Sequence, residues 1–174
     1  MTLSNPKRRE LIHTREIKCV GYKRDDGLWD IEANMKDLKS YEFNSDHRGI
    51  VKVGNAVHDM WIRLTLNNKL EIIEIEASTD SSPYKDCPLI IPNYQKLKGL
   101  IIGPGWRKLV NSRLIGVNGC THLTELLGPI ATTAFQTIYS YNLKNNKTAK
   151  PSKSLINSCH IYSENSSLVK KNFN

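Results

Sequence analysis

The sequence predicts an α+β domain in which helices pack on one face of an antiparallel sheet. Two observations support this class. Strand-like segments fill the chain up to about residue 80, and the apolar spacing becomes helical from residue 121 onward. Tight-turn signals separate the strand-like segments, so successive strands are expected to pair as hairpins.

The first predicted hairpin lies between residues 15 and 43. The segment REIKCVGYKR is followed by Asp25-Asp26-Gly27 and then by LWDIEANMKDLKSYEF. An Asp-Gly pair between strand-like segments is a strong signal for a tight hairpin turn. Residues 44–57 contain two glycines and are expected to form a loop.

The second predicted hairpin begins at His58. Apolar and polar residues alternate in HDMWIRLTL, NNK supplies the turn, and LEIIEIEA forms the return strand. The following segment, SSPYKDCP, ends the strand pattern. The strands therefore come before the helices along the chain, which is typical of an α+β arrangement.

Three helices are predicted in the second half of the chain. Two short ones lie between residues 89 and 114, separated by Gly103-Pro104-Gly105. From Thr121 to Tyr141 apolar residues recur at helical spacing, which predicts the longest helix. Asn118 or Thr121 is expected to cap this helix, and Gly128-Pro129 to kink it or to split off its first turn.

Composition divides the chain into three segments. Residues 1–10 are expected to form a flexible basic start and residues 11–142 a single α+β domain. Residues 143–174 form a polar tail that is rich in Asn, Lys and Ser and is predicted to be disordered. The net charge of +8 lies mostly at the ends, with +5 in the tail and +2 in the first ten residues. The nearly neutral domain argues against nucleic-acid binding.

The apolar segments indicate a cytoplasmic protein without a membrane partner. None reaches the roughly 20 residues that a membrane helix needs, and no apolar segment follows the basic start as a signal peptide requires. The four cysteines are then expected to be reduced thiols. Reduced thiols favour metal binding or reactivity over a disulfide framework.

Side chains that bind metals or act as nucleophiles gather at the predicted ends of strands and helices, where sites are commonly built. They are His13, His58 with Asp59, Cys87, and Cys120 with His122. Cys120 has the most specific position, because free N–H groups at a helix start stabilise a thiolate. Cys87, Cys120 and His58 with His122 or Asp59 would supply the four ligands of a zinc site. The spacing matches no standard zinc signature, so packed cysteines and hydrogen-bonded histidines stay an alternative interpretation.

Other polar residues carry weaker signals. Arg15 and Arg63 lie on predicted strands, where they could hold an anion, although exposed strand arginines are the commoner case. His47 lies in a polar loop and indicates no function.

Several short motifs resemble the hallmarks of a bacterial family that is catalogued only as a domain of unknown function. They are HTR, DGLWDIEA, HDMWIRL, IGPGWR, and GCTHL followed by TAFQ. The resemblance covers about residues 8–140, which is nearly all of the predicted domain. It implies no particular activity.

From His58 to Tyr141 the order of features is also similar to the IscU/NifU-type scaffold proteins of iron–sulfur cluster assembly. HDMWIRLTLNNKLEIIEIEA resembles their first ligand and hairpin, DCPLIIPNYQKLKGL their second cysteine and helix, and NGCTHLTELLGPIATTAF their third cysteine and last helix. The resemblance implies that His58 stands near the first ligand position, Asp59 for the scaffold's aspartate, and Cys87 and Cys120 for the second and third cysteines. It also implies an IscU/NifU-like fold, extended here by an N-terminal β-hairpin.

We therefore expect a metal-binding accessory protein that holds zinc, iron or an iron–sulfur cluster. The expected ligands are His58, Asp59, Cys87, Cys120 and His122, with His13 as a weaker candidate. One alternative is a small-molecule enzyme that uses Cys120 as nucleophile or a metal-activated water, with His58 or His122 as base. Another is a non-catalytic interaction domain. The expected partner is a protein or a small molecule.

Overall fold

The computed structural model describes residues 3–146 and 152–173. The chain forms two compact units, Met1–Phe135 and Gln136–Asn174, and the boundary falls within the last long helix. The parts of the predicted basic start and polar tail at residues 1–2, 147–151 and 174 lie outside the described residues.

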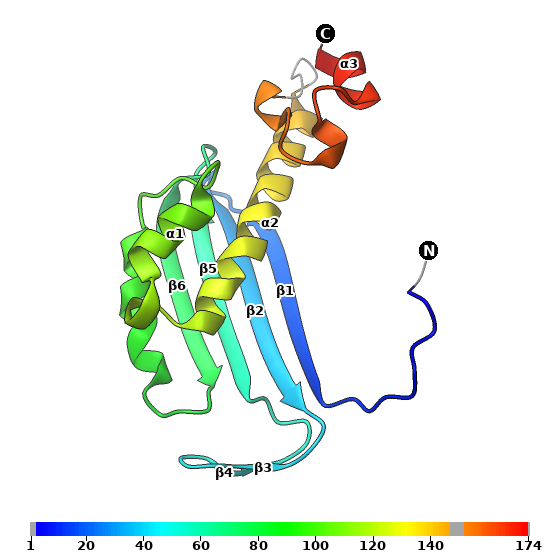
Figure 1. Ribbon diagram of the computed structural model, residues 1–174. Coiled ribbons are helices and arrows are strands. Elements are labelled where there is room, and N and C mark those ends of the chain that lie inside the picture. The colour runs from blue at the N-terminus through cyan, green and yellow to red at the C-terminus, as the bar shows by residue number, and fades with distance from the viewer. Residues whose placement is uncertain (1–2, 147–151, 174) are drawn as a thin grey trace. The chain divides into compact units, whose positions relative to one another are not determined.

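The first unit is built on a four-stranded antiparallel sheet with the strand order β1-β2-β5-β6 (Figure 1). Strands β1 (His13–Lys23) and β2 (Trp29–Lys39) form the first predicted hairpin, and β5 (His58–Leu66) and β6 (Ile72–Ser81) form the second. The two hairpins join through antiparallel pairing of β2 with β5. Both predicted hairpins are therefore confirmed.

Turn residues explain where the first hairpin reverses. Gly27 has a φ of +85°, in the left-handed region that favours glycine. The Asp26 carboxylate accepts a hydrogen bond from the Leu28 N–H at 3.2 Å. These local interactions place the turn where the Asp-Gly pair predicts it.

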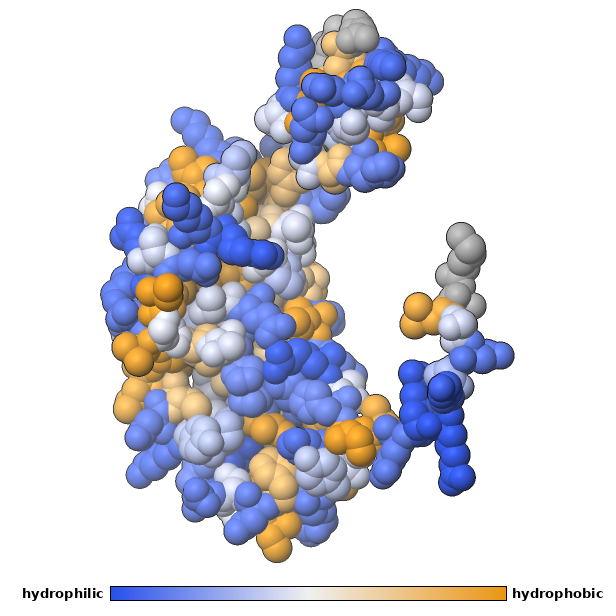
Figure 2. Space-filling model, in the orientation of Figure 1, coloured by the Kyte–Doolittle hydropathy of each residue, from blue (hydrophilic) through white to orange (hydrophobic). Residues whose placement is uncertain are grey.

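One face of the sheet is buried, because successive side chains of a strand point to opposite faces. Its buried side chains come from alternate positions of the two central strands: Trp29, Ile31, Ala33, Met35, Met60, Ile62 and Leu64. Helices α1 (Trp106–Leu114) and α2 (Thr121–Asn145) lie over this face (Figure 1). The predicted α+β class is confirmed. On the surface seen in Figure 2, hydrophobic residues of this unit are interspersed among hydrophilic ones.

Three local predictions need correction. Residues 44–57 are not all loop, because β3 (Phe43–Ser45) and β4 (Gly49–Val51) form a small second sheet. The first short helix is the 3₁₀ segment η1 (Cys87–Leu97), which contains two prolines that cannot donate α-helical hydrogen bonds. A short 3₁₀ turn, η2 (Gly116–Asn118), precedes α2. Helix α2 runs through Pro129 without interruption, so its first turn is not split off.

The second unit holds the end of α2 and three short helical segments. These are η3 (Lys153–Leu155), η4 (His160–Tyr162) and α3 (Ser167–Phe173). The sequence predicts a disordered tail here, whereas the described residues 152–173 form helical turns. Leu155 and Val169 are buried within this polar segment. Because the prediction rests on the overall composition of the segment, these two apolar residues do not affect it. No helix among the described residues is long and apolar enough to cross a membrane.

Candidate functional site

Three polar residues form a row at one end of the buried face of the sheet. Arg15 on β1 pairs with Asp37 on β2, and Asp37 pairs with His58 on β5. Asp37 follows the buried Met35 by two residues, and His58 precedes the buried Met60 by two residues, so both face the helices. Antiparallel register therefore brings together residues that are far apart in the sequence.

Asp37 is the centre of the row and is only 1% exposed. Arg15 donates to both of its oxygens, from Nε to Oδ1 at 2.7 Å and from Nη2 to Oδ2 at 2.8 Å. This two-point geometry is the strongest way in which a guanidinium holds a carboxylate. His58 Nδ1 lies 2.8 Å from Oδ2, and His13 Nε2 lies 3.3 Å from Oδ1.

These donors decide the charge of Asp37. Burial alone would raise the pKa of its carboxyl group, but the hydrogen bonds and positive charge of Arg15 and His58 lower that pKa to about 2. Asp37 is therefore an anion near neutral pH. A buried anion is expected only where such donors compensate it.

Helix α2 adds a second imidazole to the row. The rings of His58 and His122 are stacked, with centroids 3.7 Å apart and planes tilted by 30°. Burial lowers the pKa of both side chains; His122 further lowers the pKa of His58, and Arg15 further lowers that of His122. Both imidazoles thus favour the neutral form, which ligates metals and accepts protons.

The hydrogen bond with Asp37 selects the tautomer of His58. Because the Asp37 carboxylate is ionised, Nδ1 of His58 is the atom that donates to it at 2.8 Å. The lone pair of a neutral His58 then lies on Nε2. This nitrogen has the lone pair with which an imidazole binds a metal ion or accepts a proton.

Asp37, His58 and His122 are close enough together to form a candidate metal-binding group. Each offers one ligand atom, and these atoms all lie within 4.8 Å of one another. Two ligands of one zinc ion are at most about 4.2 Å apart, since each bond is about 2.0–2.1 Å long. A separation of up to 4.8 Å exceeds that limit, so the side chains would have to shift for one ion to be bound.

Arg15 joins the row to the helix layer. Its Nη1 donates to the Glu125 carboxylate on α2 at 2.5 Å, while its other nitrogens hold Asp37. One guanidinium thus connects β1, β2 and α2. The sequence predicts that Arg15 could hold an anion. In the structure that anion is the Asp37 carboxylate of the same chain.

The structure brings together only part of the predicted set. His58 and His122 are in contact, and His13 reaches the edge of the site with a side chain that is 42% exposed. Asp59 lies on the opposite face of the sheet, because neighbours on a strand point to opposite faces. There it contacts Lys36 Nζ at 3.0 Å and the Asn34 amide at 2.8 Å. Asp59, an expected ligand of the same site as His58, therefore faces away from His58, and the carboxylate in contact with His58 is Asp37.

The two predicted cysteine ligands lie outside this group. Cys87 is the first residue of η1, and Cys120 directly precedes α2. Neither belongs to a group of three or more ligand-type residues with atoms within 4.8 Å, as far as the described residues show. Their role as ligands stays a prediction from sequence.

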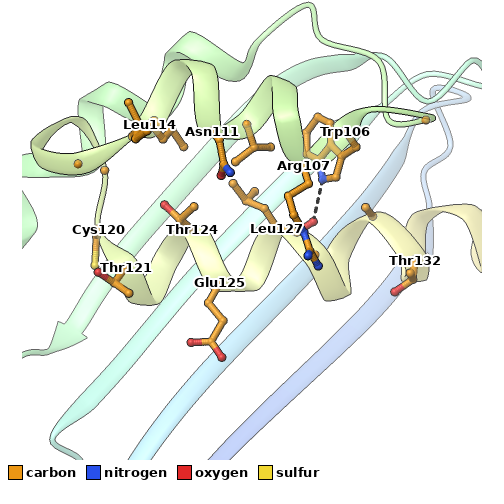
Figure 3. Close-up of a pocket in the computed structure, with 17 residues that line it drawn as sticks. Trp106, Arg107, Asn111, Leu114, Cys120, Thr121, Thr124, Glu125, Leu127 and Thr132 are labelled. Atoms are coloured by element: carbon orange, nitrogen blue, oxygen red, sulfur yellow. Dashed lines mark hydrogen bonds between the residues drawn. The ribbon is translucent and has the colours of Figure 1, made fainter.

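Cys120 instead lies at the end of a groove between α1 and α2, with a cavity volume of about 790 Å³ (Figure 3). Its carbonyl accepts the first hydrogen bond of α2, from the Thr124 N–H at 2.9 Å. The buried Tyr94 hydroxyl lies 3.1 Å from the Cys120 nitrogen and 3.0 Å from its carbonyl oxygen. These contacts fix the start of the helix that presents His122.

Asp37 is the central residue that sequence reasoning missed. A signal was present, because Trp29, Ile31, Ala33 and Met35 alternate along β2 as its apolar face. Continuing that period by two residues places Asp37 on the buried face. A carboxylate there is rare unless cationic groups surround it.

Residues 13–136 match the family DUF2889, which is described as a protein of unknown function. The chain belongs to this family. The DUF2889 match spans nearly all of the first unit and includes every residue of the row, from Arg15 to His122. The expected membership in an uncharacterised domain family is thus confirmed. No curated protein and no solved structure matches the chain.

Proposed function

We propose that this DUF2889 protein binds a divalent transition-metal ion, zinc or iron, at His58 and His122, with Asp37 as the carboxylate partner of His58. The observation that carries the proposal is the approach of three ligand atoms to within 4.8 Å on a buried face. Neutral imidazoles and carboxylates suit both metals. On this proposal the protein is a metal-binding accessory protein.

Asp37 acts in this site mainly through His58. Its two oxygens already accept hydrogen bonds from Arg15 and His58, so little of its lone-pair capacity is free. A carboxylate that accepts the second N–H of a ligating histidine orients the ring and makes the ligating nitrogen more basic. His58 Nε2 and His122 are then the direct protein ligands, and the remaining positions are open to water or a small molecule.

Metal titration of the purified full chain tests the proposal. After removal of adventitious metal, we expect about one equivalent of Zn²⁺ to bind the wild type, as zinc sites hold a single ion. His58→Ala and His122→Ala should abolish binding, whereas His47→Ala in an exposed loop should not. A wild type that takes up no metal, or binding that survives both site variants, contradicts the proposal.

An alternative proposal is an IscU/NifU-like scaffold in which Cys87 and Cys120 join His58 in holding an iron–sulfur cluster. The order of these residues along the chain supports it, together with the α+β sheet and helices. Anaerobic reconstitution with iron and sulfide is the test. Cluster absorption that disappears in Cys87→Ser and Cys120→Ser supports the scaffold. Metal binding unchanged in both variants assigns the metal to the imidazoles alone.

A second function, a small-molecule enzyme, is favoured by the 2.8 Å hydrogen bond between Asp37 and His58. A buried carboxylate that holds one ring nitrogen leaves the other as a general base. A bound metal would supply a water that ionises near neutral pH. Cys120 is the candidate nucleophile of this enzyme, and electrophile labelling tests it. If Cys120 reacts no faster than the exposed Cys159, the nucleophile form is excluded.

A further inference from the structure

The open edge of β1 is a surface that the proposed metal site does not use. β1 is an outer strand and pairs with β2 over eleven positions without a register shift. Among the described residues, no other strand pairs with it. A long, regular edge presents unpaired N–H and C=O groups that are ready to bond another strand.

We propose that two copies of this chain associate through antiparallel β1–β1 pairing centred on Ile17. The two four-stranded sheets would then form one continuous sheet across a two-fold axis. In this register Ile17 faces the Ile17 of the second copy. Glu16 faces Lys18 of the second copy, and Lys18 faces its Glu16.

The hydrogen-bond pattern of β1 permits this register. The Ile12 carbonyl accepts from the Ser40 N–H at 3.3 Å, so even-numbered residues bond with β2. The odd-numbered residues of β1 therefore direct their N–H and C=O groups to the open edge. Pairing centred on Ile17 matches odd-numbered with odd-numbered residues. It would form about ten main-chain hydrogen bonds, a number typical of a protein interface.

Charge complementarity selects this register. Glu16 and Lys18 are exposed, and neither has an ion pair within 4.0 Å among the residues that the structure describes. Glu16 also lies opposite Lys36 on β2, and Lys36 contacts Asp59 at 3.0 Å. Lys18 of the second copy would extend this row of alternating charges across the interface.

Exposed apolar side chains add a second match. Ile12, Ile17 and Tyr22 are 49%, 37% and 47% exposed, although they lie on or next to a regular strand. The proposed register places Ile12 opposite Tyr22 of the second copy and Ile17 opposite itself. Pairing would therefore cover all three, which contributes favourable burial of apolar surface.

Sedimentation equilibrium of the full chain at low salt tests the proposal. The wild type should dimerise in a concentration-dependent way. Glu16→Lys and Lys18→Glu each place like charges opposite one another twice per dimer. Each should raise the dimer dissociation constant by about tenfold, because two cross-strand pairs change and together contribute between about 1 and 2 kcal/mol.

The doubly exchanged variant, Glu16→Lys with Lys18→Glu, decides between this register and any other contact. It restores opposite charges across the axis, so dimerisation should recover to near the wild-type level. Glu74→Lys on β6 changes the net charge by the same amount as Glu16→Lys and should leave the dimer intact. A monomeric wild type, single variants that stay dimeric, or a double variant that stays monomeric while folded by circular dichroism overturns the proposal.

Discussion

Asp37 and Asp59 occupy neighbouring positions at the same end of the sheet, but on opposite faces. Asp37 lies under the helices, is 1% exposed, and accepts hydrogen bonds from Arg15 and His58. Asp59 lies on the open face with an 18% exposed side chain, and contacts Lys36 and Asn34. The same residue type thus forms the centre of a buried polar site in one case and a surface ion pair in the other.

The difference shows that the face of the sheet on which a carboxylate lies determines how its charge is stabilised. On the open face, water solvates the charge and screens its partner, so the ion pair contributes little. On the buried face, the charge is tolerated only because the guanidinium and imidazole groups compensate it. We therefore expect substitutions around Asp37 to affect one another strongly, and those around Asp59 to be nearly independent.

Removing each carboxylate gives the largest expected contrast. Asp37→Ala leaves Arg15 and His58 without their partner, and we expect it to lower the free energy of unfolding by about 3 kcal/mol. Asp59→Ala should lower it by less than about 1 kcal/mol. Urea denaturation followed by circular dichroism measures both. Equal losses would show that the buried row has no special stability.

The zinc affinity of variants at the two aspartates should differ in the same direction. Asp37→Asn keeps the side-chain shape but removes the charge that orients His58, so zinc affinity should fall by about 10- to 100-fold. Asp59→Asn, on the far face, should leave zinc affinity unchanged. Calorimetric titration of both variants makes the comparison. A larger effect at Asp59 would move the site to the open face.

The pH dependence of the free energy of unfolding should reveal the ionisation of the Asp37 carboxyl group. Its folded-state pKa of about 2 lies below the ordinary value of 3.8, so its contribution is present above about pH 4. That contribution, about 2 kcal/mol, is lost as the pH falls from 4 towards 2. Urea unfolding of the wild type should show this loss. In Asp37→Asn the same interval should be flatter, and an unchanged slope would exclude Asp37 as its source.

Arginine substitutions should give the smallest contrast. Arg15→Lys keeps the charge but loses the two-point contact with Asp37, at an expected cost of about 1 kcal/mol. Arg63 is 41% exposed and contacts Glu32 and Glu76 on the open face. Arg63→Lys should therefore cost less than about 0.5 kcal/mol. Thermal denaturation of the two variants, compared with the wild type, checks the order.

The strands, hairpins and main helix were predictable because their signals are local. Alternation along β5 and the Asp-Gly turn before β2 depend only on neighbours in the sequence. The helical turns at residues 152–173 are harder to predict, because the segment is polar in composition and only two of its side chains, Leu155 and Val169, are buried apolar residues. Proline content likewise explains why η1 is a 3₁₀ segment and not an α-helix.

The site was predictable only in part. His58 and His122 were identified from their residue type and their positions at the starts of β5 and α2. Their carboxylate partner depends on the register between β2 and β5, which brings Asp37 opposite His58. No local pattern in the sequence specifies the register between β2 and β5. Sequence alone therefore identifies Asp59, the neighbour of His58 along the chain, as a candidate ligand and does not identify Asp37, its neighbour in space.

X-ray absorption at the zinc edge of the metal-loaded full chain tests the central claim most directly. Nitrogen and oxygen ligands lie about 2.0–2.1 Å from zinc, and thiolate sulfur about 2.3 Å. We predict a nitrogen and oxygen shell with imidazole scattering and no sulfur, as binding through His58 and His122 requires. A sulfur shell, or a chain that takes up no zinc, would contradict the account.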